Sequence, residues 1–128
     1  MRFVYFLSDQ TGVTAETLGH SLITQFDGQD FQQVTLPFID NEDKAKEVVL
    51  RINSSIKDNS LKPIIFSTFI SLELRDIVRK VNGLHLDIFD VFLMPLEDEL
   101  KQKPTNKSGL AHGMSNANTY MKRIEANN

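Results

Sequence analysis

The sequence contains no cysteine, which excludes disulfide bonds and thiolate chemistry and is compatible with a reducing compartment. No apolar run reaches the ~18 residues that a membrane-spanning helix needs. The N-terminus has neither a basic region nor a signal-peptide cleavage site. We therefore expect a protein of the cytoplasm with no membrane partner.

Several chemical signatures are also missing. The histidines His20, His85 and His112 do not have the spacing of metal ligands, so no metal site is predicted. Neither Gly-x-x-x-x-Gly-Lys-Ser/Thr nor Gly-x-Gly-x-x-Gly occurs, and no Ser-His-Asp assignment is justified by spacing. The residues themselves therefore identify no catalytic group in this chain.

What is present is typical of one soluble globular domain: 128 residues, 41% of them hydrophobic and 24% charged. The net charge of −3 is unevenly distributed, because residues 1–100 carry −7 and residues 101–128 carry +4. The basic end could meet phosphate or an acidic partner, pack on the acidic body, or form a solvated connector. Its charges are not interleaved with aromatic residues, so no nucleic-acid partner is expected.

Four strand–helix repeats can be read along the chain. Strands are predicted at 2–7, 33–38, 63–67 and 84–88. Helices are predicted over about 14–26, after a capping pair at Asp40 and Asn41, after a cap at Ser71, and through Phe89–Leu100. Pro95 lies inside the last pattern, which predicts a kink or a helix that begins there.

Strands that alternate with helices predict parallel pairing through right-handed crossovers. The predicted fold class is α/β: a small, open, mainly parallel four-stranded sheet with helices on both faces, Rossmann-like in architecture. We expect this domain to span residues 1–100. Residues 101–128 are expected to form an irregular basic extension with a short helix at about 117–126, and its ending resembles a cut rather than a finished domain.

The segment 8–14 is the most informative one, because it joins a buried strand to a helix through a polar turn. Ligands of open parallel sheets bind beyond the carboxyl ends of the strands, where helix N-termini favour anions. The turn offers a carboxylate, three hydroxyls and a glycine, and the candidates for phosphate or nucleotide binding are Ser8, Asp9, Thr11, Gly12 and Thr14. An ordinary structural explanation stays open: Thr14 would cap the helix, Asp9 would hold the turn and Gly12 would supply a positive φ.

Further candidates follow the third strand and lie in the polar extension. Ser67 and Thr68 could contact a substrate or partner, although a Ser/Thr turn explains them equally well. His112 stands beside a glycine, where it could reach a phosphate or substrate, although a lone loop histidine is more often inert.

At these residues the chain resembles the bacterial phosphoenolpyruvate synthase regulatory proteins, of the kinase/pyrophosphorylase family that also includes pyruvate, phosphate dikinase regulatory proteins. The resemblance begins with Tyr5–Asp9 and Thr11–Leu22 and continues through Thr35–Asp40 and Pro63–Thr68. It ends with Pro95–Glu97, Ala111–Gly113, Tyr120 and Arg123–Ala126. One departure is Gln10, where many relatives carry glycine.

The resemblance implies a bifunctional serine/threonine kinase and phosphotransferase. Such proteins use ADP to phosphorylate a threonine of phosphoenolpyruvate synthase, or of the dikinase, and reverse this with inorganic phosphate, releasing pyrophosphate. The resemblance implies that the phosphate-binding loop lies in a C-terminal domain absent from this chain, and that the full protein uses ADP and phosphate with a divalent metal.

This chain is accordingly expected to be the N-terminal domain, with His112 and Arg123 as candidate substrate or partner contacts, and a homodimer is one option for its assembly. Two alternatives stay open. One is a non-catalytic docking or dimerisation module, and the other is a stand-alone small α/β ligand-binding protein.

Overall fold

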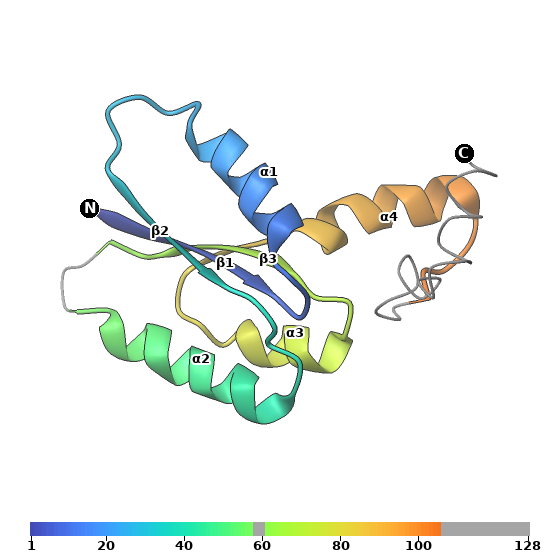
Figure 1. Ribbon diagram of the computed structural model, residues 1–128. Coiled ribbons are helices and arrows are strands. Elements are labelled where there is room, and N and C mark those ends of the chain that lie inside the picture. Colours follow the sequence, from blue (N-terminus) through green and yellow to red (C-terminus); the bar gives the residue numbers. More distant parts are fainter. Residues whose placement is uncertain (58–60, 106–128) are drawn as a thin grey trace.

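The computed structural model describes residues 1–57 and 61–105 of the chain (Figure 1). Strands and helices alternate strictly along these residues. They are β1 (Arg2–Ser8), α1 (Val13–Ile23), β2 (Phe31–Leu36), α2 (Glu42–Ser55), β3 (Ile64–Thr68), α3 (Leu72–Val78), β4 (Leu84–Asp87) and α4 (Ile88–Leu100). The predicted helix at 117–126 lies outside the described residues.

The four strands form one open sheet in the order β2-β1-β3-β4, and every neighbouring pair is parallel. In the register, Tyr5 of β1 lies opposite both Val34 of β2 and Ile65 of β3. The predicted α/β class and strand number are confirmed, and the sheet is parallel throughout.

Helices cover both faces of the sheet, as predicted (Figure 1). Because side chains alternate along a strand, Tyr5 and Leu7 of β1 face the layer of α2 and α3, whereas Val4 and Phe6 face the layer of α1. Ile88, at the start of α4, belongs to the α1 layer. The central strand β1 therefore contributes to both halves of the core.

Gly19 permits the close approach of α1 to the sheet. A Cβ atom at this position would lie 2.4 Å from Cε1 of Phe6 and 2.9 Å from Cδ2 of Phe66. These two rings stack with their centroids 5.8 Å apart, so a methyl group has no room there. The glycine thus sets the distance between the helix and the strands that it covers.

Local chemistry explains most of the helix starts. Asn41 caps α2 by accepting a hydrogen bond from the backbone N–H of Lys44, and Ser71 caps α3 by accepting one from Leu74, as the sequence predicted. Asp87 caps α4 in the same way. The predicted strand ending at Ile88 is therefore one residue too long, since Ile88 is the first residue of α4.

Two other predicted boundaries are wrong for identifiable reasons, and one of the two alternatives for Pro95 is excluded. The helix predicted to reach residue 26 ends at Ile23, because Phe26 is exposed and adds no core contact. Strand β2 spans Phe31–Leu36 instead of 33–38, since the positive φ of 58° at Phe38 takes the chain out of extended geometry. Helix α4 runs through Pro95 and does not begin there.

Candidate functional site

The strand order creates a crevice at the carboxyl edge of the sheet. From β1 the chain passes to α1 on one face, whereas from β3 it passes to α3 on the other face (Figure 1). The loops after these two adjacent strands consequently diverge, and this is the point at which open α/β sheets bind ligands. The segment 8–14 lies on one side of this point and residues 69–71 lie on the other.

The loop after β1 is held by its neighbours. The buried hydroxyl of Ser8 accepts a hydrogen bond from the backbone N–H of Gln10 at 2.9 Å and donates to the carbonyl of Thr68 at 3.4 Å. The backbone N–H groups of Phe38 and Ile39 donate to the carbonyls of Gln10 and Ser8 at 2.8 and 2.9 Å. The loop is thus joined to the ends of both β2 and β3.

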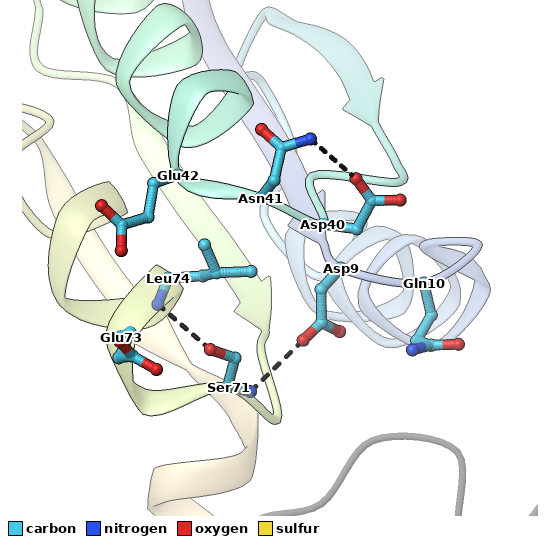
Figure 2. A pocket seen from close by; sticks show the side chains of 8 residues that line it. All are labelled: Asp9, Gln10, Asp40, Asn41, Glu42, Ser71, Glu73 and Leu74. Atoms are coloured by element: carbon cyan, nitrogen blue, oxygen red, sulfur yellow. Dashed lines mark hydrogen bonds between the residues drawn. The ribbon is translucent and has the colours of Figure 1, made fainter.

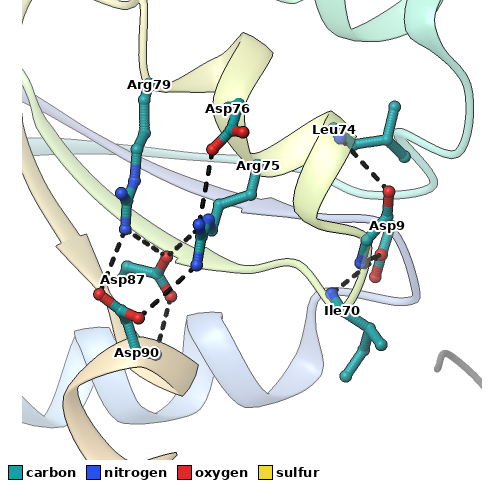
Figure 3. Close-up of polar contacts among 9 residues, drawn as sticks. Asp9, Ile70, Leu74, Arg75, Asp76, Arg79, Asp87 and Asp90 are labelled. Carbon is teal, nitrogen blue, oxygen red and sulfur yellow. Dashed lines mark hydrogen bonds and ion pairs between the residues drawn. The ribbon is translucent and has the colours of Figure 1, made fainter. Parts of the chain in front are cut away.

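Asp9 bridges the crevice. Its Oδ2 atom accepts hydrogen bonds from the backbone N–H groups of Ile70 at 3.1 Å and Ser71 at 3.3 Å (Figure 3). Only 7% of the residue is exposed, and its Oδ1 atom is buried without a hydrogen-bond partner. Asp9 therefore holds the β3–α3 loop rather than its own turn, which is a longer-range role than the structural explanation predicted.

The N-terminus of α1 has no side-chain cap. Gly12 occupies the cap position with a φ of 84°, so its predicted positive φ is confirmed, whereas Thr14 lies inside the helix and is not the cap. The hydroxyl of Thr11 reaches only the N–H of Val13, at 3.4 Å. Residues 11, 13 and 14 are exposed.

The other three helices of the described part each have a side chain bonded at this position, namely those of Asn41, Ser71 and Asp87. Since α1 differs from them in this respect, an anion could accept hydrogen bonds from the N–H groups in its first turn. Gly12 also lies close to β2, since a Cβ there would be 3.2 Å from Cγ2 of Thr35.

A cavity of about 280 Å³ lies next to Asp9 (Figure 2). It lies between the first turns of α2 and α3, and its lining residues are Asp9, Gln10, Asp40, Asn41, Glu42, Ser71, Glu73 and Leu74. Four of these carry carboxylates, of which Asp40 is paired with Lys44 at 3.1 Å, whereas Glu42 and Glu73 form no ion pair with any described residue. The cavity therefore disfavours phosphate and favours groups that donate hydrogen bonds or carry positive charge.

The prediction of this edge missed two acids, Glu42 and Glu73, which line the cavity together with Asp9 and Asp40. A signal for them existed, since each stands in the first turn of a helix or just before one. Acids there usually serve the helix dipole, so the sequence alone gave no reason to place them in one cavity.

The structure brings Ser8, Asp9, Thr11, Gly12 and Thr14 together in one loop, as their adjacency requires. Ser67 and Thr68 are buried in β3, opposite Leu7 and Ser8. Their side chains therefore offer little surface to a protein partner, and their role stays a prediction. His112 and Arg123 lie outside the described residues.

A cluster of charges joins α3 to the start of α4 (Figure 3). Nη2 of Arg79 lies 2.9 Å from Oδ2 of Asp87 and 3.4 Å from Oδ2 of Asp90, and Nη1 of Arg75 lies 3.6 Å from Oδ1 of Asp90. Arg75 lies on α3 and Arg79 is the residue that follows this helix, one turn further along, and the aspartates stand three residues apart at the start of α4. These mutual contacts give the cluster a structural role.

No group of histidine, aspartate or glutamate side chains in the described residues could hold a metal ion. None of the helices in residues 1–57 and 61–105 is long and apolar enough to cross a membrane.

The fold and the carboxyl edge of the sheet together define a small parallel α/β domain, in which a helix N-terminus without a side-chain cap lies at the switch point. Comparison with known families makes this specific: a sequence model of the kinase/pyrophosphorylase family matches residues 4–128. The chain therefore belongs to the kinase/pyrophosphorylase family.

Curated relatives agree with this assignment. A protein from Legionella pneumophila (strain Corby) is 45% identical to this chain over 125 residues. A protein from Alkalilimnicola ehrlichii is 46% identical to it over 127 residues. A third, from Marinobacter nauticus, is 42% identical over 127 residues. All three carry the name "Putative phosphoenolpyruvate synthase regulatory protein". The matches cover 98–99% of this chain but 46–47% of each relative, so the chain spans about half the length of these relatives.

Proposed function

We propose that this chain is the N-terminal domain of a cytoplasmic regulator of phosphoenolpyruvate synthase, and that it contributes a nucleotide- or phosphate-binding loop. The names of the curated relatives support the regulatory role. The single observation that supports the loop is the uncapped N-terminus of α1 beside the switch point.

The proposed reaction of the complete regulator has two directions. In one, the terminal phosphoryl group of ADP passes to a threonine hydroxyl of the synthase, leaving AMP. In the other, inorganic phosphate takes that phosphoryl group, leaving free threonine and pyrophosphate. Transfer of this kind needs a backbone cradle and a cation around the moving phosphoryl group. Residues 1–128 contain no Gly-x-x-x-x-Gly-Lys-Ser/Thr sequence, so we assign the transfer, and any divalent metal that it uses, to a further C-terminal domain.

Within this chain, an anion would lie at the start of α1 and not in the acidic cavity. The N–H groups in the first turn of α1 and the hydroxyls of Thr11 and Thr14 would serve as donors, and Gly12 would permit close approach of the backbone. Asp9 would then fix the loop from behind through its bonds to Ile70 and Ser71, without touching the phosphate.

Calorimetric titration of ADP, AMP and inorganic phosphate into the 128-residue chain tests this proposal. We expect saturable binding of at least one of them and at least about tenfold weaker binding in Thr14→Glu, because the new carboxylate would stand where the phosphate binds. An acid in the first turn suits the helix dipole, so the variant should fold. Thr17→Glu, one turn further along α1, is the matched control and should bind normally.

Absence of saturable binding for all three compounds would remove the nucleotide-binding role and leave the family assignment intact. The second candidate function, a non-catalytic docking module, would then be favoured. The acidic cavity between α2 and α3 supports it, because the carboxylates of Glu42 and Glu73 in its lining suit a basic segment of a partner protein. Biolayer interferometry with purified phosphoenolpyruvate synthase tests this, and Glu42→Gln with Glu73→Gln should weaken that contact.

A further inference from the structure

The carboxylate of Asp9 uses only one of its two oxygen atoms. Oδ2 accepts hydrogen bonds from the backbone N–H groups of Ile70 and Ser71, whereas Oδ1 is buried and has no hydrogen-bond partner in the described part of the chain. A buried carboxylate oxygen without a partner is unfavourable, and native structures rarely contain one. Asp9 lines the cavity between the first turns of α2 and α3 (Figure 2), so a donor that enters this cavity would supply the missing partner.

The other acids of the cavity add negative charge that neighbouring side chains do not cancel. Asp40 is paired with Lys44 at 3.1 Å, but Glu42 and Glu73 form no ion pair within residues 1–57 and 61–105. The N-terminal ends of α2 and α3 each contribute about half a positive charge, which offsets roughly one of the three remaining carboxylates. A charge of roughly −2 is therefore left for a ligand to neutralise.

The arrangement of these acids favours an organic cation. The described residues contain no group of side chains that could hold a metal ion. The three remaining carboxylates instead come from three elements, since Asp9 follows β1, Glu42 begins α2 and Glu73 lies in the first turn of α3. A guanidinium group has five N–H donors in a flat, rigid fork and can bond several separate acceptors, whereas an ammonium group is a compact point charge.

The size and charge of the cavity favour a side chain over a free small molecule. Its volume of about 280 Å³ lies below the roughly 300–1,000 Å³ of typical small-molecule pockets. Free arginine would also bring its own carboxylate toward exposed Glu42 and Glu73, which would repel it. An arginine inside a polypeptide carries no such group.

We propose that the cavity between α2 and α3 binds the guanidinium group of one arginine side chain of a partner protein. One N–H group donates to Oδ1 of Asp9, and the other donors face the carboxylates of Glu42 and Glu73. The proposal rests on the docking role given above as the second candidate function, for which it specifies the chemistry of recognition. It requires no nucleotide at the start of α1.

Nuclear magnetic resonance titration of the 128-residue chain with capped peptides tests the proposal. The probe is a five-residue peptide with one arginine between glycines, and the comparison peptides carry lysine or citrulline, the uncharged analogue of arginine, at the same position. We expect saturable shifts of the amide signals of Ile70 and Ser71 with the arginine peptide. Binding of the citrulline peptide and of free L-arginine should be at least about tenfold weaker, and the lysine peptide should bind clearly more weakly than the arginine peptide.

Two variants locate the binding site. Asp9→Asn keeps one oxygen for the N–H groups of Ile70 and Ser71 but places an amide group, which cannot accept, at the position of Oδ1. It should weaken binding of the arginine peptide at least about tenfold. Glu42→Gln with Glu73→Gln should do the same at low salt.

The matched control removes two acids of α2 that lie outside the cavity. Asp43 and Glu47 are exposed and do not line it, so Asp43→Asn with Glu47→Gln should bind the arginine peptide normally. Because all of these changes except Asp9→Asn are at exposed positions, far-ultraviolet circular dichroism should show an intact fold.

Several results would overturn the proposal: no saturable shift with the arginine peptide, equal binding of the citrulline or lysine peptide, equal binding of free L-arginine, or normal binding in both variants of the cavity. The interferometry experiment with phosphoenolpyruvate synthase separates this failure from that of the docking role. If the synthase binds and the arginine peptide does not, docking stands and arginine recognition is wrong.

Discussion

At the scale of single residues, Asp9 shows how a candidate ligand residue can have a structural task. Its carboxylate accepts two backbone N–H groups from a loop more than sixty residues away in the sequence. Backbone N–H groups that are part-buried need an acceptor, and the carboxylate supplies it at the crevice itself. Asp9, which the sequence suggests as a binding residue, therefore stabilises the shape of the site.

We expect Asp9→Ala to lower the free energy of unfolding by about 2–4 kcal/mol, because it leaves the N–H groups of Ile70 and Ser71 without their acceptor. Asp9→Asn keeps one acceptor oxygen and should lower the free energy of unfolding by clearly less. Urea denaturation followed by circular dichroism measures both. Equal stability of Asp9→Ala and the wild type would show that the two hydrogen bonds contribute nothing. Because of this expected instability, Asp9→Ala is a poor probe of ligand binding, and Thr14→Glu is the better one.

At the scale of elements, the two helices on the α1 face of the sheet differ in how they are held. Helix α1 lies flat on the strands because Gly19 allows it, whereas α4 contacts the sheet mainly through its first residue, Ile88. The charge cluster of Arg75, Arg79, Asp87 and Asp90 then fixes the start of α4 against α3. Most of the remainder of α4 is exposed, and only Phe89, Asp90, Leu93 and Glu97 are partly buried.

Pro95 weakens the helical hydrogen bonds of α4, because a proline in a helix interior lacks the N–H that would bond four residues back. Pro95→Ala restores this donor toward the carbonyl of Val91 and should stabilise the C-terminal half of α4 by up to about 3 kcal/mol. Hydrogen exchange of the amides in residues 96–100 should slow accordingly. Glu99→Ala, on the same helix but without a backbone change, serves as the control. Unchanged amide exchange rates in Pro95→Ala would mean that Pro95 does not destabilise the helix.

At the scale of the whole molecule, β1 joins the two layers of the core. Leu7 and Tyr5 pack under α2 and α3, and Val4 and Phe6 pack under α1. Since one strand supplies adjacent residues to both layers, neither layer can lose its packing without disturbing the strand that the other uses. The described residues should therefore unfold as one cooperative unit.

Leu7→Ala tests this cooperativity. Leu7 is fully buried, so its truncation should cost about 2–5 kcal/mol. Although Leu7 faces α2 and α3, the slowest-exchanging amides of α1, on the opposite face, should lose protection by the same amount. Leu50→Ala, at an exposed position, should change little. Loss of protection confined to α2 and α3 would show that the two layers unfold separately.

Local patterns predicted the features that depend on neighbouring residues. The caps at Asn41 and Ser71 were predicted because a capping side chain bonds an N–H only three residues away. The Ser8–Thr14 loop was located from a strand, a turn and a helix in succession. The family was identified from contiguous motifs and is confirmed by the match to residues 4–128.

Boundaries and distant pairings were not predicted, because they depend on what the rest of the chain covers. The exposure of Phe26 ends α1 early, and the pairing of β2 with β1 sets which residues of β2 are extended. The arginines of α3 and the aspartates at the start of α4 each have an ordinary local spacing. Only the packing of the two helices brings them within ion-pair distance.

By itself, the sequence determined the alternation of strands and helices, the parallel α/β class, the caps at Asn41 and Ser71, and the family. These follow from periodicity and short-range hydrogen bonding, which operate within a few residues. The tertiary structure alone decided that Asp9 binds the loop after β3, that four acids share one cavity, and that most of α4 is exposed. Those features depend on which segments far apart in the chain pack against each other. A pattern of neighbouring residues does not contain that information.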